Sequence, residues 1–290
     1  MSLFSPALPP FAGAFARIGF CLMLLTENIS VANACTLWAA AGPEANGGTL
    51  LAKNRDWKPD HRQTLKRVRS QNGLAFFGLY TQDNDDPGIK AGINEKGLSI
   101  VVAASNIPKK LRHTQPGKHG VISMILEKYA SVDALLADAE KVFSVARANY
   151  YLISNHHQML MAEIGLNGKF QLTRVENGLL THTNHYLDPT LATIYNTKTR
   201  DSSTLRLQRI NQLLADAARP YSITQFIDMS RDTKNGPDNS LWRSGKTKTM
   251  ASWIVETPID GAPHLHVVIA NPNEKETTYN EVLDASFWDR

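Results

Sequence analysis

The chain has 290 residues, of which 42% are hydrophobic and 20% are charged, and its formal net charge is +4. This is ordinary globular composition, and the length allows a sizeable buried core. The small basic excess is spread along the chain. It therefore argues against a nucleic-acid-binding protein, which needs Lys and Arg concentrated on one surface.

The first 34 residues have the pattern of a secretory signal peptide. Arg17 precedes a short apolar run at 18–25, and Ala32-Asn33-Ala34 supplies a small-x-small cleavage site. The apolar run is too short to span a bilayer. We therefore expect residues 1–34 to be removed, and the mature protein to be periplasmic or secreted, with no membrane association.

Two alternatives to a cleaved signal peptide remain open. Residues 1–34 could be a poorly ordered extension of a cytosolic protein. The leader could also belong to a lipid-anchored binding protein with an acylated Cys35, although Ala32 stands where such signals normally have a large aliphatic residue. Acylation would block both reactive groups of that cysteine, so N-terminal mass spectrometry separates the anchored protein from an enzyme.

Cys35 directly follows the cleavage site and is the candidate nucleophile. The sequence has two cysteines, and removal of the leader with Cys21 leaves only Cys35, so no intramolecular disulfide is expected. A new N-terminal cysteine carries a thiol and an α-amine with a reference pKa of roughly 7.7–8.0. The amine can accept the thiol proton, which is a recognised way to activate a side-chain nucleophile.

The first half of the predicted domain consists mainly of strands separated by Gly, Asn and Pro turns. Strands are expected at 35–40, 49–54, 74–81, 90–93 and 98–105. Loops are expected at 58–73, at 83–88, which is acidic, and at 106–119, which is rich in basic residues.

The second half alternates between helices and strands. Helices are expected at 120–130 and 132–143, followed by strands at 149–154, 158–164, 169–175 and 179–183. An amphipathic helix is expected at 203–218, and Ser222 with Gln225 forms a capping-box pattern for a shorter helix. Two last strands are expected at 249–257 and 264–270.

No repeat, linker or change of composition divides residues 35–290, so we expect a single domain there. Many antiparallel strands with two groups of helices indicate an α+β fold, in which helices cover the outer faces of two stacked sheets.

Several short motifs occur in a definite order along the whole of this domain. They are Cys35-Thr36, Lys53-Asn54-Arg55-Asp56-Trp57, the segment 92–98, Asn106-Ile107-Pro108, Thr183-Asn184-His185, the segment 202–206, the segment 249–252 and the segment 269–272. Together they resemble the N-terminal-nucleophile (Ntn) hydrolases of the choloylglycine hydrolase and penicillin V acylase group. The Thr-Asn-His and closing Asn-Pro segments resemble the related isopenicillin-N acyltransferase-like family.

The resemblance implies a four-layer αββα sandwich and an enzyme that cleaves a linear carbon–nitrogen amide bond, or transfers its acyl group, through a thioester. It also implies roles for individual residues. Cys35 matches the nucleophile, and Asp56 matches the acid that holds the α-amine. Asn184 and Asn106 match donors to the oxyanion, and Arg206 matches a structural or site arginine.

Lys53 departs from the family pattern, which usually has arginine at this position. A lysine can lower a thiol pKa by its charge, but it lacks the planar two-pronged geometry of a guanidinium. Lys53 is therefore also a predicted site residue.

The remaining expectations concern ligands and rival enzymes. No cofactor is expected, and His264 with His266 has no neighbouring Cys or carboxylate pattern to complete a metal site. The papain-like signature around a catalytic cysteine is missing at Cys35. The expected partner is a small-molecule N-acyl amide. Its identity, hydrolysis versus acyl transfer, and self-association into a homo-oligomer stay open.

Overall fold

The computed structural model describes residues 1–2, 34–82, 87–114, 121–196, 199 and 201–290. The signal peptide predicted for 1–34 lies outside this part of the chain except at its ends, and so do residues 83–86 of the acidic loop and 115–119 of the basic loop. The fold belongs to the unit from Val31 to Arg290. Within the described residues, every helix is too short or too polar to cross a lipid bilayer.

The first antiparallel sheet has six strands in the order β10-β1-β2-β11-β12-β13. Its strands are β1 (Ala34–Ala41), β2 (Thr49–Trp57), β10 (Gly178–His182), β11 (Lys248–Thr257), β12 (His264–Ile269) and β13 (Thr277–Val282). A short 3₁₀ helix, Gly42–Ala45, helps to connect β1 with β2, and the left-handed Asn46 ends it. Every residue of β1 and β2 is buried, so both strands lie at the centre of the unit.

The second antiparallel sheet has seven strands that follow one another in chain order. They are β3 (Arg62–Val68), β4 (Phe76–Gln82), β5 (Gly88–Asn94), β6 (Ser99–Ala104), β7 (Asn149–Ser154), β8 (Met159–Ile164) and β9 (Phe170–Val175). The central strands β5 to β8 are largely buried, whereas the edge strand β9 alternates between exposed and half-buried residues.

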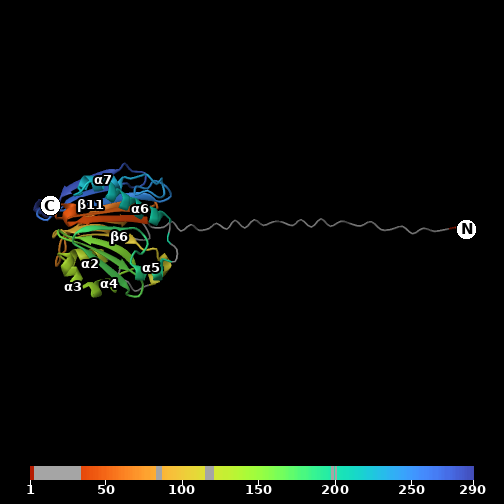
Figure 1. The fold of residues 1–290 in the computed structure, drawn as a ribbon, viewed down its shortest axis with the longest axis horizontal. Coiled ribbons are helices and arrows are strands. Elements are labelled where there is room, and N and C mark those ends of the chain that lie inside the picture. The colour runs from red at the N-terminus through yellow and green to blue at the C-terminus, as the bar shows by residue number, and fades with distance from the viewer. Residues whose placement is uncertain (3–33, 83–86, 115–120, 197–198, 200) are drawn as a thin grey trace. The chain divides into compact units, whose positions relative to one another are not determined.

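Helices cover the outer face of each sheet (Figure 1). The second sheet is covered by α2 (Val121–Lys128), α3 (Val132–Ala137) and α4 (Ala139–Phe143), and the first by α6 (Asp201–Asp216) and α7 (Ile223–Ser230). The remaining helices are α1 (Lys109–Thr114), α5 (Pro189–Tyr195) and α8 (Ala285–Asp289). The predicted α+β sandwich of two antiparallel sheets with outer helices is confirmed.

Three hydrophobic clusters separate these four layers. One lies between the two sheets and includes Leu37, Leu152 and Trp253. A second packs α2 to α4 on the second sheet, and a third packs α6 and α7 on Trp38 and its neighbours. Since successive side chains of a strand point to opposite faces, β1 directs Leu37 into the inter-sheet core and Trp38 into the helical layer.

Several predicted segments need correction. The expected loop at 58–73 contains the edge strand β3, and α1 lies in the expected basic loop. The helix expected at 132–143 is two helices that meet at Asp138. The short elements α5, β13 and α8 were not predicted. These elements are short or largely solvent-exposed, so their sequences carry little hydrophobic periodicity.

Asn94, at the end of β5, links the second sheet to α2. Its side-chain amide donates to the carbonyls of Leu126 and Tyr129, at 2.9 and 2.8 Å, and its Oδ1 accepts from the backbone of Lys96 and Leu98. The side chain is fully buried. One asparagine therefore holds both the β5–β6 turn and the end of α2.

We predict that Asn94→Ala destabilises the protein by about 2–4 kcal/mol, because several buried backbone groups lose their partner at once. Thermal unfolding followed by circular dichroism measures this, with the exposed Asn72→Ala as the matched control. Equal melting temperatures for the two variants would contradict the structural role of Asn94.

Candidate active site

Cys35 lies near the start of β1, between β10 and β2 in the first sheet. It pairs with Arg55 on β2, and Ala34 pairs with Asp56. The Cys35 side chain belongs to the inter-sheet core and is 2% exposed. Strand alternation puts Arg55 on the same face of the sheet as the thiol, whereas Asp56 faces the helical layer of α6 and α7.

The backbone of Cys35 is held by Asn184 and Arg206. The Cys35 backbone nitrogen donates to Asn184 Oδ1 at 2.8 Å. Arg206 Nη1 donates to the Cys35 carbonyl at 2.6 Å and to Thr36 Oγ1 at 2.8 Å, and Nη2 donates to Asn184 Oδ1 at 3.0 Å. Segments more than 140 residues apart in sequence therefore meet at the predicted nucleophile.

Arg206 is fully buried on α6, and this burial lowers its pKa to about 10, opposed by the nearby negative charge of Asp56. A guanidinium with this pKa is still charged at neutral pH. It supplies a fixed positive charge on the helical side of the sheet, beside the backbone of the nucleophile.

Asp56 is fully buried and only partly hydrogen-bonded. Its Oδ1 accepts from Thr249 Oγ1 at 2.8 Å, while Oδ2 has no hydrogen-bond partner among the described residues. Burial raises its pKa to about 6, against the opposing effects of Arg206 and Arg243. A buried carboxylate oxygen without a donor lies next to the position of Ala34, the residue that the predicted cleavage would remove.

Lys53 crosses from the first sheet to the second. Its ammonium donates to the backbone carbonyls of Lys90 on β5 and Val102 on β6, at 2.9 and 2.5 Å. Burial lowers the pKa of Lys53 to about 7, although the proximity of Cys35 opposes this shift. The structure thus places Lys53 close enough to Cys35 for the two groups to influence each other electrostatically.

The side-chain amide of Asn106 forms its hydrogen bonds with residues other than Cys35. Its Nδ2 donates to Asn196 Oδ1 at 2.9 Å, and its Oδ1 accepts from Tyr150 at 3.4 Å. The amide of Asn184 is closer to the nucleophile, and its Nδ2 donates to the Ala104 carbonyl at 2.9 Å. Donation to an oxyanion by either residue remains a prediction.

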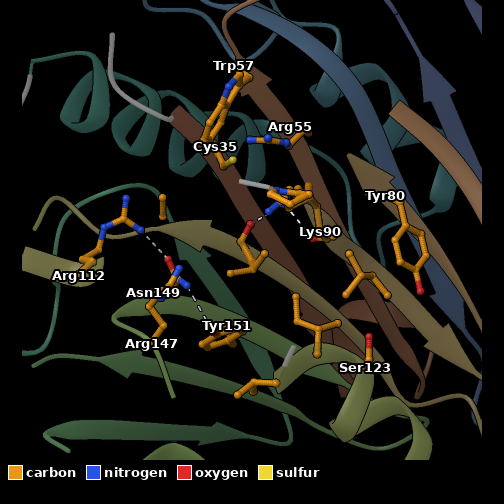
Figure 2. A pocket seen from close by; sticks show the side chains of 18 residues that line it. Cys35, Arg55, Trp57, Tyr80, Lys90, Arg112, Ser123, Arg147, Asn149 and Tyr151 are labelled. Atoms are coloured by element: carbon orange, nitrogen blue, oxygen red, sulfur yellow. Dashed lines mark hydrogen bonds between the residues drawn. The ribbon is translucent and has the colours of Figure 1, made fainter. Parts of the chain in front are cut away.

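A cavity of about 200 Å³ opens beside the thiol and extends past β5 and β6 to the start of α2 (Figure 2). Cys35, Lys53 and Arg55 line one end, and Arg112 and Asn149 line another wall. The basic segment at 106–119 thus contributes Arg112 to the cavity. The segment at 58–73, expected to be a loop, does not contribute a described lining residue.

The histidines named in the sequence analysis have other partners. His266 contacts Asn280 at 2.7 Å, and His264 lies 3.3 Å from Glu256. Among the described residues, there is no cluster of three His, Cys, Asp or Glu side chains that could hold a metal ion.

Two groups near Cys35 were missed at the sequence level. Thr249 lies in a quoted motif but received no role, and it holds Asp56. Arg55 lies in the motif between Asn54 and Asp56 and likewise received no role. Strand alternation would have put Arg55 on the face of the nucleophile once the pairing of β1 with β2 was known.

The match to a family model covers residues 44–272, more than half of the chain. That model describes acyl-coenzyme A:6-aminopenicillanic acid acyl-transferase. The chain belongs to this family. Membership supports acyl transfer or amide hydrolysis as its class of chemistry, and the predicted resemblance to Ntn hydrolases is confirmed. No curated protein sequence matches the chain.

Two solved structures share the fold. An N-acylethanolamine-hydrolyzing acid amidase ortholog from Caenorhabditis elegans matches with a TM-score of 0.53 and 13% identity, over 77% of this chain and 92% of that one. A variant of the conjugated bile acid hydrolase from Clostridium perfringens matches with a TM-score of 0.50 and 12% identity, over 87% and 94% of the two chains. At these identities the likeness shows a common fold.

The lowered pKa of Lys53 predicts a pH-dependent effect of Lys53→Met on stability. Between about pH 7 and the ordinary lysine value of 10.5, the unfolded chain binds more protons at this position than the folded chain. The stability cost of burying the amine is therefore fully present below pH 7 and disappears as the pH rises toward 10.5.

The melting temperature of Lys53→Met minus that of the wild type should therefore be largest at pH 6–7. It should fall steadily as the pH rises toward 10. Thermal scans across this range measure it, with the exposed Lys248→Met as the control. A difference that stays constant with pH would show that the buried amine has an ordinary pKa.

Proposed function

We propose that this chain is an amidohydrolase whose nucleophile is the thiol of an N-terminal Cys35, formed by removal of residues 1–34. The observation that carries the proposal is the set of groups around the Cys35 backbone nitrogen. Asn184 Oδ1 accepts from it at 2.8 Å, Arg206 holds the adjoining carbonyl, and Asp56 has a vacant carboxylate oxygen nearby. An ordinary cysteine enzyme has no need for such groups around a peptide nitrogen.

The proposed reaction begins with proton transfer from the Cys35 thiol to its own α-amine. The sulfur then attacks the carbonyl carbon of a linear amide, and negative charge forms on the carbonyl oxygen. The α-ammonium returns the proton to the leaving nitrogen as the carbon–nitrogen bond breaks, which leaves a thioester. Water attacks the thioester with loss of a proton to the α-amine, and the free acid leaves.

Asn184 can contribute twice to this reaction. Its Oδ1 orients the α-amine, and its Nδ2 carries two hydrogens, of which the Ala104 carbonyl uses one. The second hydrogen can be donated to the oxyanion, since Ala104 lines the cavity. Asn106 Nδ2 already donates to Asn196 Oδ1 at 2.9 Å and to the Tyr195 carbonyl at 3.4 Å, so it would need to release one of them before it could donate in the same way.

Acyl transfer to an amine acceptor is the alternative reaction on the same groups. The description of the matching family, an acyl-transferase, favours it. Chemically the two reactions differ only in whether water or an amine attacks the thioester. A panel of linear N-acyl amides assayed with and without an added amine acceptor distinguishes them.

The lipid-anchored alternative fits the geometry poorly. The Cys35 side chain is 2% exposed and faces a cavity of about 200 Å³. A diacylglyceryl group on this sulfur would need far more space. Export to the periplasm or the exterior remains our proposal on the basis of the leader sequence, and a linear N-acyl amide remains the proposed substrate.

The free α-amine can be tested with two proteins, one beginning at Cys35 and one with a non-cleavable Gly-Ser extension before it. The extended protein keeps its thiol, but the nitrogen is an amide that can neither accept the thiol proton nor protonate the leaving group. We expect circular dichroism to show that the extended protein folds normally, but we expect it to form no thioester. The control Cys35→Ala, which lacks the thiol, should also fold and form no thioester. Equal rates of amine release by both proteins would place the general base elsewhere, and His182 or His185 would then become the candidate.

We further predict that Asp56→Asn in the processed protein lowers kcat by about a hundredfold, because the α-amine is no longer held in position. The exposed Asp260→Asn should have no effect. Because burial raises the Asp56 pKa to about 6, its carboxylate is lost as the pH falls below that value. The new ammonium opposes this shift, so wild-type activity should decline at or below pH 6. A wild-type kcat for Asp56→Asn would refute the assigned role.

A further inference from the structure

The cavity beside Cys35 is strongly basic. Five cationic side chains line it, and none of its described lining residues is acidic: the basic residues are Lys53, Arg55, Lys90, Arg112 and Arg147. They come from β2, β5, α1 and the segment before β7, so the tertiary fold gathers them. The two cations at the Cys35 end of the cavity, Lys53 and Arg55, are both buried and repel each other, and a bound anion would relieve this repulsion.

Arg55 is the cation best placed to meet a substrate. It is 2% exposed and stands directly opposite Cys35 in the pairing of β1 with β2. Figure 2 shows its side chain extending toward Cys35 and Trp57 at one end of the cavity. Its guanidinium carbon lies 4.1 Å from the centre of the Trp57 ring, and this stacking fixes the plane of the group.

The hydrogen bonds of Arg55 leave one edge of the guanidinium vacant. Nη1 makes a long contact of 3.5 Å with the Asp56 carbonyl, whereas Nε and Nη2 have no hydrogen-bond partner among the described residues. These two nitrogens form the side of the guanidinium that binds a carboxylate with two parallel hydrogen bonds. A buried donor left without a partner is costly, and native proteins rarely keep one without a reason.

We propose that Arg55 binds a carboxylate of the substrate, close to the amide bond that Cys35 attacks, and so selects anionic N-acyl amides over neutral ones. This rests on the proposed function, because it assigns the substrate class of the same site. The carboxylate can belong to the acyl group, as in a dicarboxylic acid monoamide, or to the leaving amine, as in an N-acyl amino acid.

Arg55 could instead stabilise the oxyanion of every substrate. That role would affect neutral and anionic amides equally, whereas a carboxylate-binding role affects only the anionic ones. The ratio of kcat/KM between the members of a matched pair therefore separates the two roles.

Two matched pairs of substrates test the proposal with the processed protein. Glutaryl anilide and its methyl ester place the charge on the acyl side. N-hexanoyl glycine and N-hexanoyl glycinamide place it on the leaving side. In at least one pair, we expect kcat/KM for the anionic member to exceed that for the neutral member by about tenfold or more, the effect of a charged hydrogen bond.

Variants of Arg55 connect this preference to the guanidinium. Arg55→Gln should abolish the preference, so that kcat/KM falls about tenfold more for the anionic member of a pair than for its neutral member. Arg55→Lys should retain part of the preference, because it keeps the charge but loses the two-pronged edge. The control Arg219→Gln removes an exposed arginine that pairs with Glu44 outside the cavity, and it should change nothing.

A binding measurement tests carboxylate recognition by Arg55 independently of catalysis. Calorimetric titration of the Cys35→Ala protein with each substrate pair should show tighter binding of an anionic member, and the added Arg55→Gln change should remove the difference. Equal binding of both members by the Cys35→Ala protein that retains Arg55, or an equal loss of kcat/KM for both members on Arg55→Gln, would overturn the proposal. Absence of turnover with the expected binding difference would refute the amidohydrolase reaction alone.

Discussion

The site depends on the buried guanidinium of Arg206, which links α6 to the start of β1 and to the segment after β10. Without this contact the Cys35 carbonyl, Thr36 and Asn184 would have no common partner. A guanidinium suits the position because its several donors diverge in one plane and can serve three acceptors at once. The cost of burying its charge is offset by these hydrogen bonds and by the nearby Asp56 carboxylate.

The groups around Cys35 lie on both sides of the first sheet. The inter-sheet face carries the thiol together with Lys53 and Arg55, while Asp56 faces the helical layer, where Arg206 of α6 holds the Cys35 carbonyl. The backbone of Cys35 therefore lies between these two sets of groups. An enzyme that used the cysteine side chain alone would need groups on one face only, so the arrangement suits a residue whose main-chain nitrogen also takes part.

The central strands could be predicted from the sequence because buried strands show apolar runs. The family could be predicted because its motifs follow a fixed order. The sequence was insufficient for the edge strands β3 and β13, whose polar residues pair through the backbone and carry no hydrophobic signal. The role of Arg55 could not be read from its neighbours either. Its importance arises from register and from the stacking on Trp57, which are properties of the folded sheet. The motif that contains Asn106 was recognised in the sequence, but the direction of its amide, which donates to Asn196, could not be predicted from the motif.

The buried carboxyl of Asp56 also affects how the stability of the chain changes when the leader is removed. In the uncut chain burial raises the pKa of this carboxyl from 3.8 to about 6, so the contribution of Asp56 to the stability of the precursor falls as the pH rises through this range. Under the proposed processing, cleavage before Cys35 places a positive charge beside the same carboxylate. The cut that creates the nucleophile would then also lower the pKa of Asp56, and the contribution of this group to stability at neutral pH would be larger in the mature protein than in the precursor.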